Sequence, residues 1–345
     1  MYQRGSTIVL TLIAILALGT IGFVIYKTTQ DLEEADIILS PFTKLTQKLK
    51  PDQNEYTGED QHPLGKPLVG VLFGIDRRSR AEGYRTDIMI IIAANPDTNK
   101  VVMASIPRDL WYGGGRINAL YPAQGWESFQ SAVFELTGVK PERFVLTDFN
   151  DFQWVVDAMG GVPVEIETTF TDTSYPVDAT FEYQTVSFAK GDEKLTGSRA
   201  LIYARSRKGD FDNGDWGRMK RQHNILKGML IAVAQPESLF NPMVVEKAYK
   251  TVTEGKMDTN LSVMDAKYLW DYYKDKDKYT IESLYMDYDY LYTPPSDEYG
   301  GAWVMVPKPG GAEQFKQAIL SKLNGTETPI ESYLEQSQNN EQDHQ

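Results

Sequence analysis

Residues 87–106, DIMIIIAANPDTNKVVMASI, contain the clearest structural signal in the sequence. Two runs rich in Ile, Val and Met flank Pro96-Asp97-Thr98-Asn99, four residue types that favour turns. This pattern predicts a hairpin of two buried strands. The preceding apolar run, PLVGVLFGID at 67–76, is typical of a strand that is covered on both faces. The core is therefore expected to be a β-sheet.

Helical and strand-like patterns alternate after this hairpin. This alternation predicts an α/β fold, a layered α-β-α domain over residues 67–323 with a central mixed sheet flanked by helices. A helix over 150–161 is expected to have Asn150 as its cap. The other expected helices are 127–138, 196–205, 216–234, 241–254, 262–274 and 312–323, and the other expected strands are 143–149, 162–167, 279–286 and 302–307.

The N-terminal segment GSTIVLTLIAILALGTIGFVIY, residues 5–26, contains no charged residue. As a helix it would be about 33 Å long, enough to cross the hydrocarbon core of a bilayer. Arg4 precedes it and acidic residues follow Lys27, which predicts a cytoplasmic N-terminus. A cleaved signal peptide is the alternative. We expect a cytoplasmic N-terminus at 1–4, a transmembrane signal anchor at 5–27, an extracytoplasmic stalk at 28–66 and a disordered polar tail at 324–345.

The composition excludes several function classes. The chain has 35 Lys and Arg against 48 Asp and Glu, a formal net charge of −13, which argues against binding to nucleic acid. It has no cysteine, so a thiolate nucleophile is absent. Of its three histidines only His223 lies within a strong helical pattern, and a catalytic triad would depend on it almost alone.

The arginines are nevertheless concentrated. Residues 200–222, ALIYARSRKGDFDNGDWGRMKRQ, contain Arg205 and Arg207 at an expected helix end. In the next helix Arg218 and Gln222 are four residues apart and share a face, with Arg221 close by. Arginine matches the oxygen atoms of phosphate groups. The cluster therefore indicates a small anionic ligand, with a solvated amphipathic face as the alternative.

Carboxylates and a further arginine follow the expected strands. Asp76 ends one strand and Asp87 begins the next, so the two carboxylates can lie side by side, an arrangement that suits Mg²⁺. Arg108 and Asp109 follow Pro107, which ends the third strand. Ordinary surface ion pairs and a structural Arg–Asp pair are the alternatives at these two places.

Several motifs occur together in one order between about residues 67 and 232. They are FGIDRR, YRTD, SIPRDLW, RINALY, DAMGGVPVEI, KGDEKLTGSRALIYARSR and GDWGRMKRQ. In this set the chain resembles the LytR-CpsA-Psr family of cell-wall phosphotransferases. The resemblance implies an anchored extracytoplasmic enzyme that moves a phosphoglycan from a polyprenyl-diphosphate carrier to a peptidoglycan hydroxyl.

The resemblance also implies roles for individual residues. Asp76 and Asp87 would hold Mg²⁺, and either Asp76 or Asp109 would accept the hydroxyl proton. The catalytic set would comprise Asp76, Arg108, Asp109, Arg205 and Arg207. The diphosphate would be bound by Arg78, Arg85, Arg108, Arg205, Arg207, Arg218, Arg221 and Gln222.

Two other functions would use the same residues. A pyrophosphatase would pass the phosphate to water, and a non-catalytic envelope protein would bind the lipid without turnover. The insert KGDFDNGD, residues 208–215, adds carboxylates between the two arginine groups and bears on the choice of acceptor. The glycopolymer, the acceptor sugar and the oligomeric state stay open at this point.

Overall fold

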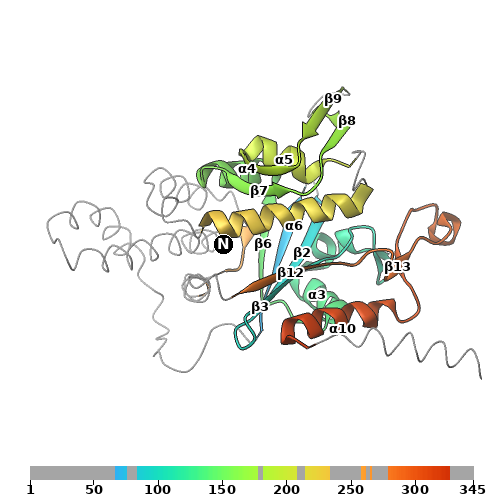
Figure 1. Ribbon diagram of the computed structural model, residues 1–345. Coiled ribbons are helices and arrows are strands. Elements are labelled where there is room, and N and C mark those ends of the chain that lie inside the picture. Colours follow the sequence, from blue (N-terminus) through green and yellow to red (C-terminus); the bar gives the residue numbers. More distant parts are fainter. Residues whose placement is uncertain are drawn as a thin grey trace, which may run out of the picture. The chain divides into compact units, whose positions relative to one another are not determined.

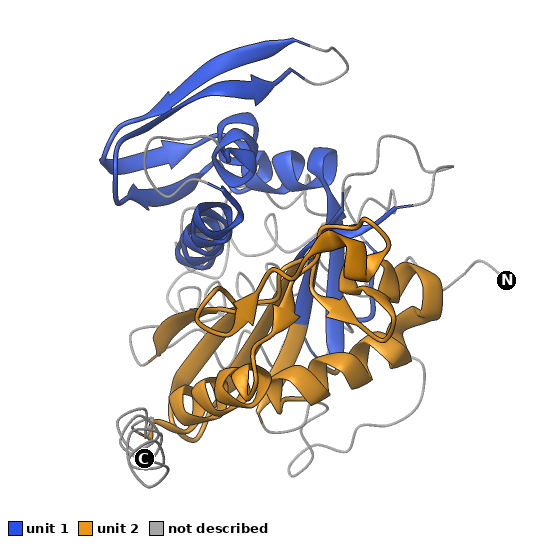
Figure 2. Cartoon of the chain, turned by 90° about the vertical axis from the view of Figure 1, so that its right-hand side faces the viewer, with its two compact units in different colours: residues 1–65, 71–88, 143–278 blue, residues 66–70, 89–142, 279–345 orange. Residues whose placement is uncertain are grey.

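The computed structural model describes residues 67–75, 84–177, 182–207, 214–233, 258–261, 265 and 279–326 (Figure 1). The chain divides into two compact units (Figure 2). Unit 1 comprises residues 1–65, 71–88 and 143–278, and unit 2 comprises 66–70, 89–142 and 279–345. The expected helices at 241–254 and 262–274 and the expected segments before residue 67 lie outside the described residues, apart from Asp265.

The largest sheet is mixed and has the strand order β11-β6-β1-β2-β3-β12. Strand β3 pairs antiparallel with β2 and parallel with β12, and β11 pairs antiparallel with β6. This arrangement confirms the predicted α/β class with a mixed central sheet. The strands are β1 (Leu68–Ile75), β2 (Thr86–Asn95), β3 (Lys100–Ser105), β6 (Arg143–Asp148), β11 (Asp258–Thr259) and β12 (Thr280–Tyr285).

Unit 2 contains the predicted hairpin. Asn95 pairs with Lys100, and Asn99 in the turn has a left-handed φ of 56°, a conformation that asparagine tolerates. Helix α3 (Leu120–Thr137) ends at Gly138, whose φ of 72° is readily adopted by glycine. Helix α10 (Gly311–Asn324) contacts α3 and β3 and buries Phe315 and Ile319. These contacts give unit 2 its own apolar core.

The remaining elements of unit 2 are short. Two-residue strands β4 (Trp111–Tyr112) and β5 (Gly115–Arg116) pair with each other, as do β13 (Leu291–Tyr292) and β14 (Val306–Pro307). The other two are 3₁₀ helices, η1 (Ile117–Ala119) and η3 (Ser296–Tyr299). The strand predicted over 302–307 is therefore confined to β14, which lies outside the six-stranded sheet.

Unit 1 contains the helices α4 (Phe149–Ala158), α5 (Gly197–Arg205) and α6 (Gly214–Val233). Helices α5 and α6 bear predicted arginines. Strand β7 (Val162–Ile166) pairs antiparallel with β10 (Gly191–Leu195), and β8 (Phe170–Pro176) pairs antiparallel with β9 (Tyr183–Phe188). Strands β8, β9 and β10 were not expected from the sequence, because their residues are mostly polar and partly exposed.

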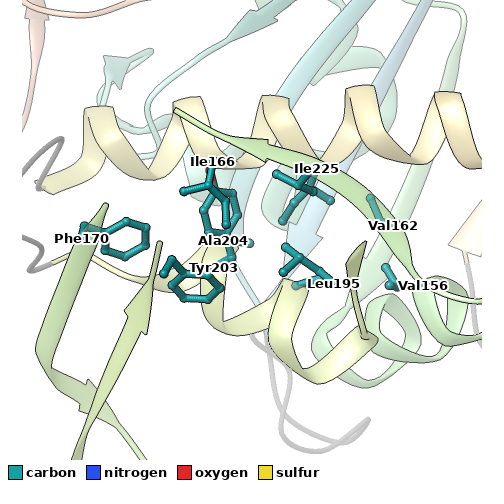
Figure 3. Packing of buried hydrophobic residues seen from close by; sticks show 11 residues of the cluster. Val156, Val162, Ile166, Phe170, Leu195, Tyr203, Ala204 and Ile225 are labelled. Carbon is teal, nitrogen blue, oxygen red and sulfur yellow. The ribbon is translucent and has the colours of Figure 1, made fainter. Parts of the chain in front are cut away.

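One apolar cluster joins these elements of unit 1 (Figure 3). Ile225 of α6, Tyr203 and Ala204 of α5, and Phe170 of β8 are among its buried members. Helix α6 passes β7 so closely that a Cβ atom on Gly228 would lie 2.1 Å from the carbonyl oxygen of Pro163. Glycine is therefore required at this contact between a helix and a strand.

The cap of α4 differs from the prediction. The carboxylate of Asp148 accepts hydrogen bonds from the backbone nitrogens of Asn150 and Asp151, so Asp148 is the cap and Asn150 lies inside the first turn. Asp and Asn are equally favourable capping residues. Asp148 takes the cap position because its backbone is extended at the end of β6. Within the described ranges, no helix combines the length and the apolar character that a membrane crossing requires.

Candidate functional site

Arg205 is the last residue of α5 and is held by two aromatic rings. Its guanidinium carbon lies 4.2 Å from the ring centre of Phe149 and 5.6 Å from that of Tyr175. Its Nη1 donates a hydrogen bond of 3.3 Å to the Tyr175 hydroxyl. Cation–π contacts of this kind hold a guanidinium in place without neutralising its charge. These contacts position the Arg205 side chain.

Arg207 follows α5 after Ser206, whose φ of −55° and ψ of 137° take the chain out of the helix. The backbone nitrogen of Arg207 donates a 3.1 Å hydrogen bond to Asp172, a buried carboxylate of β8. The Arg207 side chain is 41% exposed, and its Nε lies 3.5 Å from a carboxylate oxygen of Asp215. Its backbone is thus fixed while its guanidinium faces solvent.

Arg218 converges on the same carboxylate. Its Nη2 lies 3.1 Å from the Asp215 oxygen that Arg207 approaches, so one carboxylate lies between two guanidinium groups. The Arg218 residue is only 7% exposed, and within the described part of the chain its Nε has no hydrogen-bond acceptor. Such a buried donor costs about 1–3 kcal/mol when it is left unsatisfied. This nitrogen is suited to receive an oxygen atom of an anionic ligand.

Arg221 and Gln222 turn toward the end of α5. The Nε of Arg221 donates to the Tyr203 carbonyl at 3.1 Å, and its Nη2 donates to the Ser206 carbonyl. Gln222 donates from Nε2 to the Ala204 carbonyl at 3.3 Å. Both side chains are buried, and the Arg221 guanidinium lies 4.9 Å from the Phe170 ring centre. These two residues of α6 therefore contact the chain that carries Arg205 and Arg207.

The imidazole next to Gln222 is neutral. His223 is completely buried, and this burial, with a smaller contribution from the positive charge of Lys227, lowers its pKa to about 3. A neutral imidazole adds no charge to the arginine cluster.

A separate arginine–aspartate group lies in unit 2. The Asp109 carboxylate is 6% exposed and lies 3.2 Å from Nε of Arg108 and 3.4 Å from Nε of Arg116. Strand β3 ends at Ser105, before Pro107, as the sequence predicts. The second arginine partner was not predicted, because Arg116 lies beyond the intervening β4–β5 turn and no sequence spacing links it to Asp109.

The predicted metal ligands can be followed only in part. Asp87 is the second residue of β2 and is half-buried, and Arg85 is exposed just before this strand. Asp76 and Arg78 lie outside the described residues. Among the residues that are described, no group of three or more His, Asp or Glu side chains is arranged to hold a metal ion. The Mg²⁺ site stays a prediction.

The structure thus places Arg85, Asp87, Arg205, Arg207, Arg218, Arg221 and Gln222 in unit 1, and Arg108 and Asp109 in unit 2. It brings Arg207 and Arg218 together at Asp215. Reasoning from the sequence missed Phe149, Asp172 and Tyr175. Phe149 and Tyr175 lie among many aromatic residues with equal claims, and nothing near Asp172 in the sequence marks it as buried.

Residues 39–319 of the chain match the model of the LytR_cpsA_psr family. The polyisoprenyl-teichoic acid–peptidoglycan teichoic acid transferase TagU of Bacillus subtilis is 30% identical over 275 residues, covering 77% of this chain and 80% of TagU. The transferase TagV of the same organism is 27% identical over 326 residues, covering 92% of this chain and 77% of TagV.

A solved structure has the same fold. The Lin1025 protein of Listeria innocua matches with a TM-score of 0.56 and 27% identity, and the match covers 75% of this chain and 100% of that chain.

Proposed function

The chain belongs to the LytR_cpsA_psr family, and we propose that it is an enzyme that transfers a phosphoglycan from a polyprenyl diphosphate to a hydroxyl group of peptidoglycan. The names of TagU and TagV support this assignment, because both describe transfer of teichoic acid from a polyisoprenyl carrier to peptidoglycan. The product is a glycopolymer joined to the cell wall through a phosphodiester.

The observation that carries the proposal is the arrangement of cations at the end of α5. Arg205 contacts two rings, and Arg207 and Arg218 meet at Asp215. The buried Nε of Arg218 has no acceptor among the described residues. A diphosphate supplies several anionic oxygen atoms to such donors, and hydrogen bonds to charged groups contribute about 1.5–3 kcal/mol each. A neutral sugar would not compensate these charges.

The reaction is a displacement at phosphorus. The acceptor hydroxyl oxygen forms a bond to the phosphorus that carries the glycan, and the bond from this phosphorus to the bridging oxygen breaks. The polyprenyl phosphate leaves with the electron pair, and the hydroxyl proton passes to a base, for which Asp76 and Asp109 are the candidates. Negative charge accumulates on the oxygen atoms during this step, and positioned guanidinium groups stabilise it.

Of the two base candidates, Asp109 already lies between two cations. Arg108 and Arg116 approach its two carboxylate oxygens, and the residue is 6% exposed. This geometry favours a role for Asp109 in orienting Arg108, whose side chain remains 29% exposed and able to contact the donor. Asp76, which we also propose as a Mg²⁺ ligand, and Asp109 both stay candidates for the base.

We further propose that Asp76 and Asp87 hold Mg²⁺. Asp76 directly follows β1 in the sequence, and Asp87 is at the start of the neighbouring β2. Two such carboxylates would supply the hard oxygen ligands that this ion prefers and leave the remaining positions for phosphate and water. Bound there, Mg²⁺ would neutralise charge on the diphosphate. Asp87 at the start of β2 is half-buried.

The proposal includes a membrane anchor at residues 5–27. The donor is a lipid, so an enzyme tethered to the outer face of the membrane meets its substrate at the bilayer surface. The uncharged stretch between Arg4 and Lys27 supports this topology, with the catalytic part outside the cell membrane and residues 28–66 as the stalk.

The test uses the full-length chain in detergent micelles. It is incubated with a short glycan on polyprenyl diphosphate and with a peptidoglycan oligomer, in Mg²⁺ or in EDTA, and products are identified by mass spectrometry. A phosphodiester-linked glycan on the oligomer that is lost in EDTA is the expected result. Free phosphoglycan alone would instead assign a pyrophosphatase, and intact substrate bound to the protein would assign a binding role.

Arg218→Ala is the matching variant, because it removes the donor that has no described acceptor. Arg199→Ala is its control, because Arg199 lies on α5 but pairs with Glu193 and stacks on Phe188. Transfer should be lost in the first variant and kept in the second.

A further inference from the structure

We propose that Asp172 and Arg221 are positioning residues that clamp the peptide group between Ser206 and Arg207 and so aim Arg207 at the diphosphate. The inference rests on the proposed function and assigns roles that the sequence motifs do not contain. It concerns one peptide group of unit 1. The carbonyl of this group accepts a hydrogen bond from Arg221, and its N–H donates one to Asp172.

The Asp172 side of the clamp is built into a strand irregularity. The pairing of β8 with β9 shifts register between Asp172 and Tyr175. One Asp172 oxygen accepts the backbone N–H of Ser174 at 2.9 Å inside this irregular segment, and the other accepts that of Arg207 at 3.1 Å. Irregularities of this kind redirect side chains next to active sites.

The same irregular segment also reaches Arg205. Tyr175, at its other end, accepts the hydrogen bond from Nη1 of Arg205 and lies beside its guanidinium. The segment Asp172–Tyr175 thus contacts the backbone of Arg207 and the side chain of Arg205.

The Arg221 side of the clamp caps a helix. The last carbonyl groups of a helix lack partners within the helix and carry partial negative charge. Arg221 satisfies the carbonyls of Tyr203 and Ser206, and Gln222 satisfies that of Ala204. Arg221 is 4% exposed, so its fork is directed at the backbone and not at solvent. This geometry favours an indirect role over the direct diphosphate contact that the family resemblance implies.

The two contacts together restrict the rotation of one peptide group. Its orientation sets the direction in which the Cα–Cβ bond of Arg207 leaves the chain, and the guanidinium is still 41% exposed after this constraint. Misplacement of a reacting or binding group by about 1 Å can cost about 100-fold in rate. Loss of either contact should therefore weaken donor binding mainly through Arg207.

The decisive experiment is a double-mutant cycle on the full-length chain in detergent. Asp172→Asn retains one acceptor oxygen where two are needed, so one of its two backbone bonds must break. The Kd of farnesyl diphosphate, a short soluble probe, is measured by calorimetry in the wild type and in Arg207→Ala, each with and without Asp172→Asn. We expect Asp172→Asn to raise Kd about 10-fold in the wild type and less than about 2-fold beside Arg207→Ala.

Asp157→Asn is the matched control. Asp157 accepts a single backbone N–H, that of Gly197, at the opposite end of α5, and asparagine can keep this one bond. Its Kd should equal that of the wild type. Thermal unfolding separates effects on stability from effects on probe binding. Asp172→Asn should lower Tm by the same amount with arginine or with alanine at position 207.

Arg221→Lys supplies the second arm of the test. Lysine keeps the charge but cannot donate to two carbonyls with a planar fork. If Arg221→Lys raises Kd in the wild type but not beside Arg207→Ala, the clamp is supported. An equal rise in both backgrounds would establish Arg221 as a direct ligand and overturn its part of the inference. Equal effects of Asp172→Asn in both backgrounds would overturn the other part. A wild type that neither binds the probe nor transfers would instead remove the proposed function.

Discussion

The guanidinium carbon of Arg205 lies 4.2 Å from the centre of the Phe149 ring, and this contact joins the end of α5 to the start of α4. Phe149 is the first residue of α4, directly after the capping Asp148. The end of β6 and the Asp148 cap of α4 thus position the Phe149 ring, and this ring contacts the Arg205 guanidinium. The ring offers its electron-rich face and no competing negative charge.

Phe149→Leu tests this contact. The substitution keeps an apolar side chain but removes the ring, and a cation–π contact contributes about 0.5–2 kcal/mol. We expect donor Kd to rise about 2- to 30-fold, since 1.4 kcal/mol corresponds to a factor of ten. Phe152→Leu is the control on the same helix, because Phe152 packs against the apolar cluster of unit 1. For Phe152→Leu we expect a lower Tm and an unchanged Kd. If Phe149→Leu also lowers Tm without changing Kd, the contact between Phe149 and Arg205 does not contribute to donor binding.

The sequence predicted the apolar elements better than the polar ones. The strands at 86–95 and 100–105 follow from the apolar runs on either side of Pro96–Asn99, and the strand at 68–75 follows from the apolar run before them. All three are strands of the six-stranded sheet. Strands β8 and β9 have no such pattern, since one face of this ribbon is open to solvent. The register shift at Asp172 is a product of tertiary contacts and has no local sequence signature.

For the candidate site, the sequence predicted where the arginines lie on the helices but not all of their contacts. Spacing placed Arg205 and Arg207 at a helix end and Arg218 with Gln222 on one face, and the structure agrees with both placements. Spacing alone did not show that Arg221 turns toward the carbonyls of α5, because this depends on how closely α6 passes α5.

Arg218→Met should separate stability from function. Methionine has a similar shape but leaves no buried donor without an acceptor, which removes a cost of about 1–3 kcal/mol, while the Asp215 side chain is 29% exposed and keeps Arg207 as a partner. We expect the Tm of the ligand-free protein to rise while donor Kd rises at least about 10-fold, as removal of one charge-assisted contact predicts. Calorimetry and thermal unfolding measure the two effects.

The same substitution at Arg143 should have the opposite effect on stability. Arg143 binds the completely buried Asp265 with two hydrogen bonds of 2.7 and 3.0 Å. Arg143→Met would leave this carboxylate without its guanidinium partner, at a cost of about 3–5 kcal/mol. A lower Tm for Arg218→Met, as for Arg143→Met, would show that Arg218 is a structural cation.

His223 predicts how stability changes with pH. Its folded pKa of about 3 lies below the ordinary value of 6.5, so between these values the unfolded chain binds a proton that the folded chain does not. Its contribution to stability is therefore complete above pH 6.5 and falls as the pH decreases toward 3. At pH 5 the loss amounts to about 2 kcal/mol.

Urea unfolding at pH 7 and pH 5 measures this effect, with His223→Gln as the comparison. The wild type should lose about 2 kcal/mol more than the variant between the two pH values. Equal losses would show that the imidazole is already protonated in the folded protein or remains neutral in both states.

Asp87→Asn tests the proposed metal site. Asparagine keeps the shape and one oxygen ligand but removes the charge, and Mg²⁺ binds through one or two carboxylates with phosphate and water. Transfer at a low Mg²⁺ concentration should fall at least about 10-fold, and added Mg²⁺ should restore part of it if Asp76 still holds the ion. Asp192→Asn, on the exposed strand β10, is the charge-matched control and should respond to Mg²⁺ as the wild type does. If the transfer rate of Asp87→Asn depends on Mg²⁺ concentration as that of the wild type does, the ion is held by other ligands. If transfer by the wild type is insensitive to EDTA, the arginines alone neutralise the charge of the diphosphate.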